Sequence, residues 1–363
     1  MLTGMEQAVR KRLRTGYTTG ACATAAARAA FFALRHGRFP DPVTITLPGG
    51  EQPAFPLVLK AHEPGMARAG VIKDAGDDPD ITHGALIIAE VRPARAGQGI
   101  RFHAGEGVGI VTLPGLPVPV GEPAINPGPR LMIREALTQD NDGCEPDLDV
   151  ILSIPGGEKL AQRTMNPRLG IVGGLSILGT TGIVRPYSCA AWIASIRESV
   201  DVARALKLAH IAGCTGRTSE RAVQAHYGLS DQALIDMGDF VGGLLKYLRH
   251  HPVPRLTIAG GPGKLAKLGQ GALNLHSRRT RLNRAALAEA AAKAGADAQV
   301  CTIIHEAPTV AAMVKALEGS AFDLSALIAK SALKTVRAVL GDAPVRADVL
   351  VISARGEVLA HAE

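Results

Sequence analysis

Two glycine-bearing loops in the second half of the chain have residue types that suit ligand binding, and the first of them suits an adenosine cofactor. In the first loop, Gly213, Thr215 and Gly216 lie between an apolar run and a segment with helical periodicity. Glycines let the backbone approach a ligand, and a helix start offers free N–H groups. About 20 residues further on, Asp236 and Asp239 lie where such folds place a ribose-binding carboxylate. The alternative is a turn that binds no ligand.

The second loop, AGGPGK at 259–264, also follows an apolar run. Its closing Lys264 invites comparison with a phosphate-binding loop. However, Leu265 occupies the position of the magnesium-binding hydroxyl in that motif, and the spacing between the glycines is short. Nucleotide hydrolysis is therefore disfavoured.

An acidic loop in the first half of the chain is the third candidate. Four carboxylates fall within a short stretch, at Asp74, Asp77, Asp78 and Asp80, and His83 follows them. Carboxylates so close together repel one another unless they are solvated, liganded or hydrogen-bonded. A calcium loop would need a closing glutamate, which is absent here. A solvated turn and a functional acidic loop both stay open.

The segment TGYTTG at 15–20 precedes a long alanine run. Its Thr18 and Thr19 can bind an anion through hydroxyl and backbone N–H groups, or can simply cap the following helix. The histidines and cysteines are not spaced to place three ligands on one face, so no metal site is predicted.

The elements that would position these residues fall into two groups. The alanine run up to residue 35 predicts a helix, and apolar runs at 43–47, 55–59, 84–91 and 108–113 predict an antiparallel sheet with loops. After residue 187, strands at 207–212, 233–236, 255–259, 298–304 and 348–353 alternate with helices. Such alternation predicts a doubly wound α/β domain with a mostly parallel sheet. We place the boundary near Gly179 to Gly182, which gives domains of 1–179 and 180–363.

Composition limits the class of protein. Of the 363 residues, 47% are hydrophobic and 20% are charged, which allows a full core in each of two domains. The net charge of +7 favours an anionic ligand, whereas the 3% of aromatic residues give little support to nucleic-acid stacking. Five scattered cysteines and the absence of a long apolar run predict a cytoplasmic protein that does not enter a membrane.

Taken together, these segments resemble the CbiD family, the cobalt-precorrin-5B C-1 methyltransferases of cobalamin biosynthesis. The matching strings are LRTGYTTGACATAAARAA (13–30), VIKDAGDDPDITHGA (71–85), GIVTLPGLPVPVGEPAINPGPR (109–130), NPRLGIVGGLSILGTTGIVRPYS (166–188), MGDFVGG (237–243) and GKLAKLGQGALNLHS (263–277). The resemblance implies an α+β N-terminal domain similar to the second domain of ribosomal protein S5 and an α/β C-terminal domain. It also implies that S-adenosylmethionine (SAM) methylates C-1 of cobalt-precorrin-5B, giving cobalt-precorrin-6A in the anaerobic route.

The resemblance also suggests roles for residues inside the matching strings. We expect the carboxylates of an anionic tetrapyrrole substrate to be bound by five residues, namely Arg14, Thr18, Thr19, Arg130 and Lys264. Asp74, Asp77 or His83 would orient the substrate or relay a proton. The loop with Gly213, Thr215 and Gly216, together with Asp236 or Asp239, would bind SAM. Cobalt would enter only as part of the substrate.

Two other functions stay open from sequence. A tetrapyrrole carrier without catalysis would share the anion-binding loops but would have no affinity for SAM. A small-molecule kinase would depend on ATP and magnesium, which the apolar residue at position 265 argues against. A homo-oligomer is compatible with the sequence under each of these hypotheses.

Overall fold

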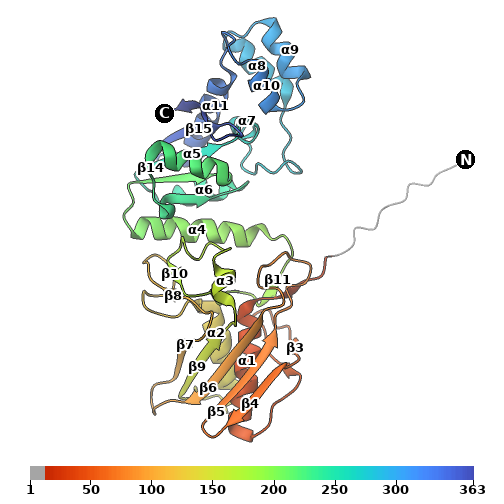
Figure 1. Cartoon of the computed structure of the whole chain (residues 1–363), viewed down its shortest axis with the longest axis vertical. Coiled ribbons are helices and arrows are strands. Elements are labelled where there is room, and N and C mark those ends of the chain that lie inside the picture. The colour runs from red at the N-terminus through yellow and green to blue at the C-terminus, as the bar shows by residue number, and fades with distance from the viewer. Residues whose placement is uncertain (1–12) are drawn as a thin grey trace, which may run out of the picture. The chain divides into compact units, whose positions relative to one another are not determined.

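The chain divides into two units between Ser188 and Cys189 in the computed structural model shown in Figure 1. The structure describes residues 13–363, so the start of the expected first domain, residues 1–12, lies outside the described part. The predicted boundary near Gly179 to Gly182 falls within the first unit, because a short strand at Ile183–Val184 pairs with another at Gly16–Tyr17.

The first unit combines helices with a five-stranded sheet. Its elements are β1 (Gly16–Tyr17), α1 (Thr19–His36), β2 (Val43–Thr44), β3 (Ala54–Phe55), β4 (Leu59–Glu63), β5 (Met66–Ile72), β6 (Leu86–Pro93), β7 (Ile100–Ala104), β8 (Ile110–Val111), α2 (Pro127–Gln139), β9 (Leu148–Ser153), α3 (Gly157–Ala161), β10 (Ile171–Val172) and β11 (Ile183–Val184). The main sheet has the order β4-β5-β6-β9-β7. Its neighbours are antiparallel except β7 and β9, which are parallel.

Helices α1 and α2 cover one face of this sheet, and the other face is polar. Thr18 caps α1, because its hydroxyl accepts a hydrogen bond from Ala21 N. The alanines of α1 are fully buried, and their small side chains let the helix lie close to β5 and β6. On the opposite face, Arg68 pairs with Glu90 across neighbouring strands. The one-sided burial explains the alternating pattern of these strands.

The predicted antiparallel sheet is confirmed in part. The run at 84–91 forms most of β6, but 43–47 and 108–113 contribute only short strands to separate two-stranded sheets. The main sheet is completed by β4, β5, β7 and β9, which lie outside these predicted runs apart from Leu59 at the start of β4.

The second unit contains a parallel sheet and most of the helices. Its elements are α4 (Cys189–Ala205), β12 (His210–Cys214), α5 (Arg217–Tyr227), a 3-10 turn (Asp231–Ala233), β13 (Leu234–Asp236), α6 (Val241–Leu248), β14 (Arg255–Gly260), α7 (Pro262–Gly269), α8 (Arg284–Lys293), α9 (Ala298–Glu306), α10 (Val310–Ala316), α11 (Leu324–Leu340), β15 (Arg346–Ile352) and β16 (Val358–Ala362).

The sheet of this unit has the order β13-β12-β14-β15-β16, and only the edge strand β16 is antiparallel. Helix α5 packs on one face, where its Val223 meets Leu350 and other buried residues of the sheet. Helices α4, α6, α7 and α11 cover the opposite face through a larger core that includes Leu244 and Ile258. Burial on both faces confirms the expected α/β layering.

The strand predicted at 298–304 is wrong, because this segment is helix α9. The β-branched residues of VCTII favour a strand, but Asp297 accepts a hydrogen bond from Val300 N and so caps a helix start. Val300 and Ile304, four positions apart, are both buried, which fits the helical period. Along residues 13–363, no helix has both the length and the apolar character of a membrane span.

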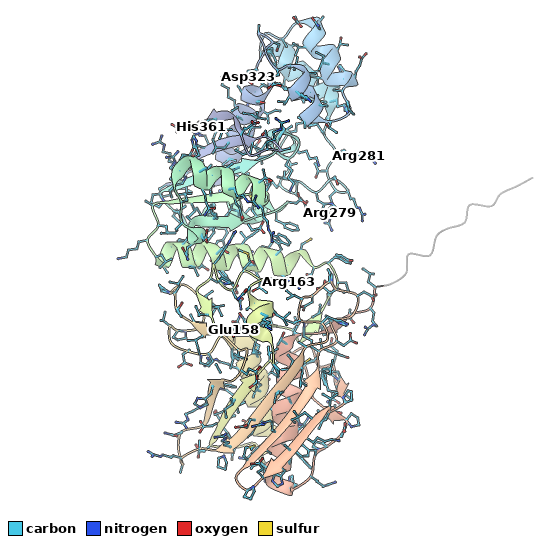
Figure 2. The ribbon with its side chains drawn as sticks, in the orientation of Figure 1. Glu158, Arg163, Arg279, Arg281, Asp323 and His361 are labelled. Carbon is cyan, nitrogen blue, oxygen red and sulfur yellow. The ribbon has the colours of Figure 1, made fainter. Side chains whose placement is uncertain are left out.

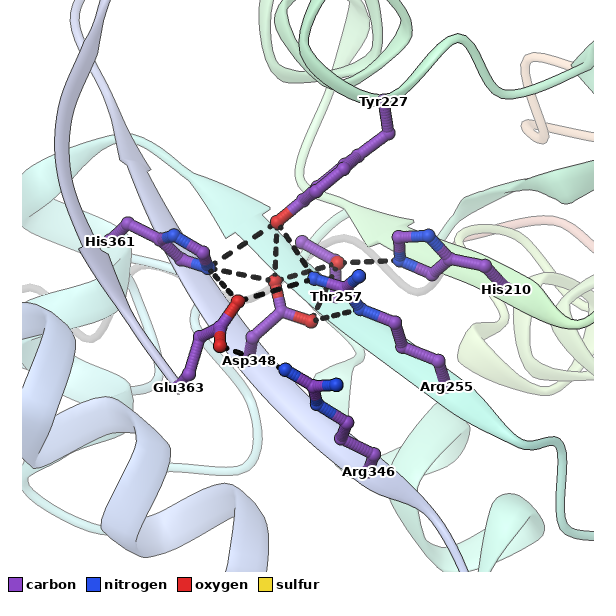
Figure 3. Close-up of polar contacts among 8 residues, drawn as sticks. All are labelled: His210, Tyr227, Arg255, Thr257, Arg346, Asp348, His361 and Glu363. Carbon is purple, nitrogen blue, oxygen red and sulfur yellow. Dashed lines mark hydrogen bonds and ion pairs between the residues drawn. The ribbon is translucent and has the colours of Figure 1, made fainter.

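A buried carboxylate organises one side of the second unit (Figure 3). Asp348, which is 1% exposed, accepts hydrogen bonds from Tyr227 at the end of α5 and from Arg255 at the start of β14, at 2.7 and 3.1 Å. Thr257 and His361 lie at 2.9 and 3.2 Å from the same carboxylate. Burial alone would raise the pKa of Asp348, but these hydrogen bonds and the Arg255 charge outweigh it and lower the pKa.

We expect Asp348→Ala to lower the free energy of unfolding of the second unit by about 3 to 5 kcal/mol, because Arg255 loses its buried partner. Urea unfolding followed by the fluorescence of Trp192, the single tryptophan, measures this change. Glu289→Ala, which removes an exposed ion pair with Lys293, is the control and should leave the free energy of unfolding close to that of the wild type.

The same carboxylate predicts a pH dependence. Because the folded state lowers the pKa of Asp348, its stabilisation is complete above the unfolded value of about 3.9 and is lost as the pH falls through the folded pKa. Asp348→Asn should remove this part of the acid sensitivity. Equal acid sensitivity of the wild type and this variant would contradict the assignment.

Candidate functional site

A cavity of about 1000 Å³ lies at the carboxyl ends of the parallel strands of the second unit. Three loops line it: Thr215–Ser219 follows β12, Gly261–Lys264 follows β14, and Ile352–Arg355 follows β15. Residues of the segment 311–325, from α10 to the start of α11, close another side. Both glycine loops identified from sequence therefore open into one cavity.

The strand order explains why a cavity forms here. Strand β12 pairs with β13 on one side and β14 on the other, and the chain runs from β12 to β13 before it crosses back to β14. The loops that leave β12 and β14 therefore diverge at their carboxyl ends. Open α/β sheets bind ligands at such a point of diverging connections.

The glycines of these loops differ in what surrounds them. A Cβ atom built on Gly216, Gly261 or Gly263 would meet nothing within 4 Å, so these positions leave space for a ligand next to the backbone. In contrast, a Cβ on Gly213 would lie 2.4 Å from a methyl carbon of Leu244. Gly213 lies inside β12 and not among the residues that line the cavity, so its lack of a side chain serves packing.

Helix α5 begins at Arg217, at the wall of the cavity. The first N–H groups of a helix have no acceptor within the helix and form the positive end of its dipole. The Ser219 hydroxyl donates to Gly216 O at 2.7 Å and therefore does not cap these N–H groups. The arrangement can bind a carboxylate or another anionic group.

Lys264 connects the two glycine loops. Its Nζ donates to Thr215 O at 3.0 Å and lies 3.1 Å from Asp239 Oδ1. Oδ1 of Asp239 is buried and has no hydrogen-bond partner among the described residues. The positive charge of Lys264 therefore offsets most of the cost of burying this carboxylate oxygen. The neighbouring Leu265 is fully buried, and therefore no hydroxyl could face the cavity from this position as in a phosphate loop.

The two aspartates predicted to bind ribose do not line the cavity. Asp236 ends β13, and its backbone oxygen accepts a hydrogen bond from Trp192 at 3.0 Å. Asp239 reaches the cavity only through Lys264. The carboxylates that line it are Glu318, Asp323 and Glu357, which the sequence analysis did not identify. Of these, Asp323, labelled in Figure 2, caps α11 by accepting from Ala326 N, a pattern that sequence could have predicted.

The acidic loop of the first unit is held by basic residues of the same unit. Arg14 forms a bidentate ion pair with Asp74, and its backbone N donates to Asp77 Oδ2 at 2.7 Å. The hydrogen bond from Arg14, with help from Gly76 N, lowers the pKa of Asp74 to about 2. The buried Lys73 ammonium contacts Asp80 and Thr82. These contacts offset the repulsion expected among the carboxylates.

His83 lies beside this ion pair and is half-exposed. Its Nδ1 accepts a hydrogen bond from Ala75 N at 3.1 Å, and the same nitrogen lies 3.8 Å from Asp74 Oδ1. When Nδ1 accepts, a neutral imidazole carries its proton on Nε2. In that tautomer His83 has an N–H donor at Nε2, which suits hydrogen bonding to an anionic ligand.

The other predicted substrate-binding residues make contacts within the first unit. Arg130 donates to Ile125 O at 2.8 Å and to Glu122 Oε2 at 3.2 Å, and it also lies over the Phe102 ring. Thr18 and Thr19 are buried, and Thr18 caps α1. In the described residues, no group of three or more His, Cys, Asp and Glu side chains could hold a metal ion.

Comparison with known proteins identifies the family. A family model named CbiD matches residues 6–186, and a model named CbiD, C-terminal domain, matches residues 274–363. The cobalt-precorrin-5B C(1)-methyltransferase of Rhodospirillum rubrum is 56% identical over 96% of this chain and 97% of its own. The chain belongs to the CbiD family. The family member of the same name from Paramagnetospirillum magneticum is 54% identical over 96% of this chain and 98% of its own.

A solved structure also belongs to the CbiD family. The cobalamin biosynthesis protein CbiD from Archaeoglobus fulgidus is 29% identical, and the match covers 74% of this chain and 83% of that chain with a TM-score of 0.40.

The ion pair at the acidic loop predicts a measurable titration. In carbon-detected NMR, we expect the Asp74 carboxyl to titrate near 2 in the wild type, and in Arg14→Gln to move toward the ordinary value of about 3.9. Arg35→Gln, which removes an exposed partner of Asp142, is the control. A wild-type Asp74 that titrates near its ordinary value would contradict the geometry.

Proposed function

We propose that this chain methylates C-1 of cobalt-precorrin-5B, with SAM as the methyl donor, in cobalamin biosynthesis. The observation that supports this reaction is a sequence identity of 53–56%, over 96% of the chain, to proteins named cobalt-precorrin-5B C(1)-methyltransferase. The donor is inferred from the chemistry of methyl transfer and from the cavity between the two glycine loops. In the described part of the chain, none of the five cysteines forms a disulfide, which supports a cytoplasmic location for this reaction.

The residues around the cavity fit SAM. The free N–H groups at the start of α5, next to Thr215 and Gly216, suit the carboxylate of its methionine part. Glu318, Asp323 and Glu357 offer acceptors for ribose hydroxyls and a negative charge near a sulfonium. We assign Lys264 and Asp239 to holding the loops in place, which is the role their mutual contact supports. We also propose that SAM binds to the second unit.

The protein needs no nucleophile of its own in this reaction. When bound, SAM supplies an electrophilic methyl group, and its transfer to an electron-rich ring carbon leaves a neutral thioether. The task of the protein is then to hold the two reactants in line at about 3 to 3.5 Å, which can supply most of the acceleration. A rigid pair of loops, fixed by Lys264, serves that positioning.

The acid–base candidates differ in what they can do. Asp74, with a pKa of about 2, is ionised at neutral pH and is too weak a base to take up a proton there. Asp77 accepts from the backbone of Arg14. We propose that His83 donates from Nε2 to a carboxylate of the substrate. Roles for Arg14, Thr18, Thr19 and Arg130 in binding the substrate stay predictions.

We expect SAM, and not ATP with magnesium, to bind the purified protein in calorimetric titration. Lys264→Met should weaken SAM binding roughly tenfold, about 1.4 kcal/mol, because both loop contacts are lost. Lys246→Met, which removes an exposed lysine from α6, is the matched control and should bind SAM as the wild type does. Normal SAM binding by both Lys264→Met and Asp239→Asn would exclude this pair from the site.

Transfer of labelled methyl from SAM to cobalt-precorrin-5B tests the reaction itself. The product should carry one added methyl group at C-1. Binding of the tetrapyrrole without any transfer, and without SAM affinity in its presence, would instead support the carrier hypothesis.

A second assay tests His83. His83→Ala should raise the KM for cobalt-precorrin-5B several-fold, about 1 kcal/mol for one hydrogen bond, while the pH–rate profile keeps its shape. A profile that loses one of its limbs in this variant would show instead that His83 transfers a proton.

A further inference from the structure

The loop between α7 and α8 carries a dense group of positive charges. We call residues 276–281 (HSRRTR) the arginine loop, since it contains Arg278, Arg279 and Arg281 within four positions. All three residues are exposed, and Figure 2 shows Arg279 and Arg281 on this loop. Among the residues that the structure describes, none of the three guanidinium groups has a hydrogen-bond or ion-pair partner.

The backbone that carries these arginines is held by many hydrogen bonds. His276 accepts from Arg278 N at its Nδ1 and from Thr280 N at its carbonyl oxygen, at 3.2 and 2.9 Å. The Thr280 hydroxyl closes the turn by donating to Asn274 O at 2.7 Å. Beyond the loop, Asn283 and Gln270 bond to one another in both directions. The charges are therefore displayed from a defined turn and not from a polar tail.

Three arginines of the first unit, in contrast, have partners in the structure. Arg14 is bound by Asp74, Arg28 by Asp140, and Arg130 by backbone oxygens and Glu122. A bound guanidinium is a poor receptor for a further carboxylate, because its donors are already used. The arginine loop has the opposite property, because like charges repel within it and no acidic side chain among residues 13–363 pairs with them.

The arginine loop is joined by hydrogen bonds to the wall of the cavity. Leu275, directly before it, donates from its N to Asp239 O at 2.8 Å and accepts from Lys267 Nζ at 2.9 Å. Asp239 in turn pairs with Lys264, which lines the cavity. The arginine loop and the proposed donor site thus share one set of contacts at the carboxyl end of the sheet.

We propose that the arginine loop is a binding site for the peripheral carboxylates of the tetrapyrrole substrate. This inference rests on the proposed function. Guanidinium groups bind carboxylates through two parallel hydrogen bonds, and three guanidinium groups carried on one defined turn suit a ligand with several carboxylates around its rim. A nucleic acid fits less well, because the arginine loop contains no Phe, Tyr or Trp on which a base could stack.

The test replaces Arg278, Arg279 and Arg281 together by Gln, which keeps polar side chains but removes the charge. The KM for cobalt-precorrin-5B should rise at least tenfold, while the KM for SAM and kcat stay within about twofold of the wild type. The rise of KM with added salt should also become less steep. A matched triple variant, Arg221→Gln, Arg249→Gln and Arg337→Gln, removes three exposed charges elsewhere in the second unit and should keep the wild-type KM.

Each outcome has a distinct meaning. If the wild type methylates cobalt-precorrin-5B and the loop variant keeps its KM, the arginine loop is not a substrate site. An equal rise of KM in both triple variants would reduce the effect to net charge and would also overturn the proposal. Loss of affinity for a labelled DNA duplex in the loop variant, with unchanged KM, would assign the arginine loop to nucleic acid. A wild type without transfer would contradict the proposed function itself.

Discussion

The Lys264 ammonium group links chain segments that follow three different strands of the second unit's sheet. The connections after β12 and β14 diverge at the carboxyl edge, and next to the strands the two glycine loops meet through Thr215 N, which donates to Ala259 O at 3.0 Å. Lys264 adds side-chain contacts by donating to Thr215 O and by pairing with Asp239. Because Asp239 also accepts from Leu275 N, the same pair fixes the segment that leads into the arginine loop. One partly buried ion pair therefore links the wall of the cavity to the segment before the arginine loop.

The distribution of charge separates structural from ligand-binding roles. In the first unit, Arg14 and Lys73 are used to fold a loop that would otherwise be destabilised by repulsion among its carboxylates. In the second unit, Asp348 draws Arg255 and Tyr227 into a buried network. The net charge of +7 is therefore not uniformly available to a ligand. What remains for an anionic substrate is the set of cations without acidic neighbours, and the arginine loop is the densest run of these in the second half of the sequence.

Much of the fold follows from local sequence, and the errors follow from tertiary contacts. The cap at Thr18, the strand before Thr215 and the helix after Gly216 all depend on short-range signals, so they could be predicted. Helix α9 could not be predicted from its β-branched residues, because the Asp297 cap and burial at helical spacing decide its form. Gly213 looks like a ligand-binding glycine in sequence, but only the packing of Leu244 against it reveals its role.

Errors in the predicted site also follow from tertiary contacts. Sequence spacing pointed to Asp236 and Asp239 as ribose partners, because it assumes that the next strand brings its carboxylate to the ligand. The structure instead lines the cavity with Glu318, Asp323 and Glu357, which come from segments far along the chain. The spacing of residues in the sequence does not predict that the loop after β12 and the start of α11 line the same cavity. Lys264 was correctly singled out from its loop, but its partners are visible only once the loops are placed.

The most direct test of the account is a crystal structure of the protein with S-adenosylhomocysteine, the product of SAM after methyl transfer. The account predicts electron density for the ligand in the cavity between the loops at 215–219 and 261–264, with its carboxylate at the start of α5. Density for the ligand in the first unit, beside the acidic loop and TGYTTG, would contradict the assignment of donor binding to the second unit.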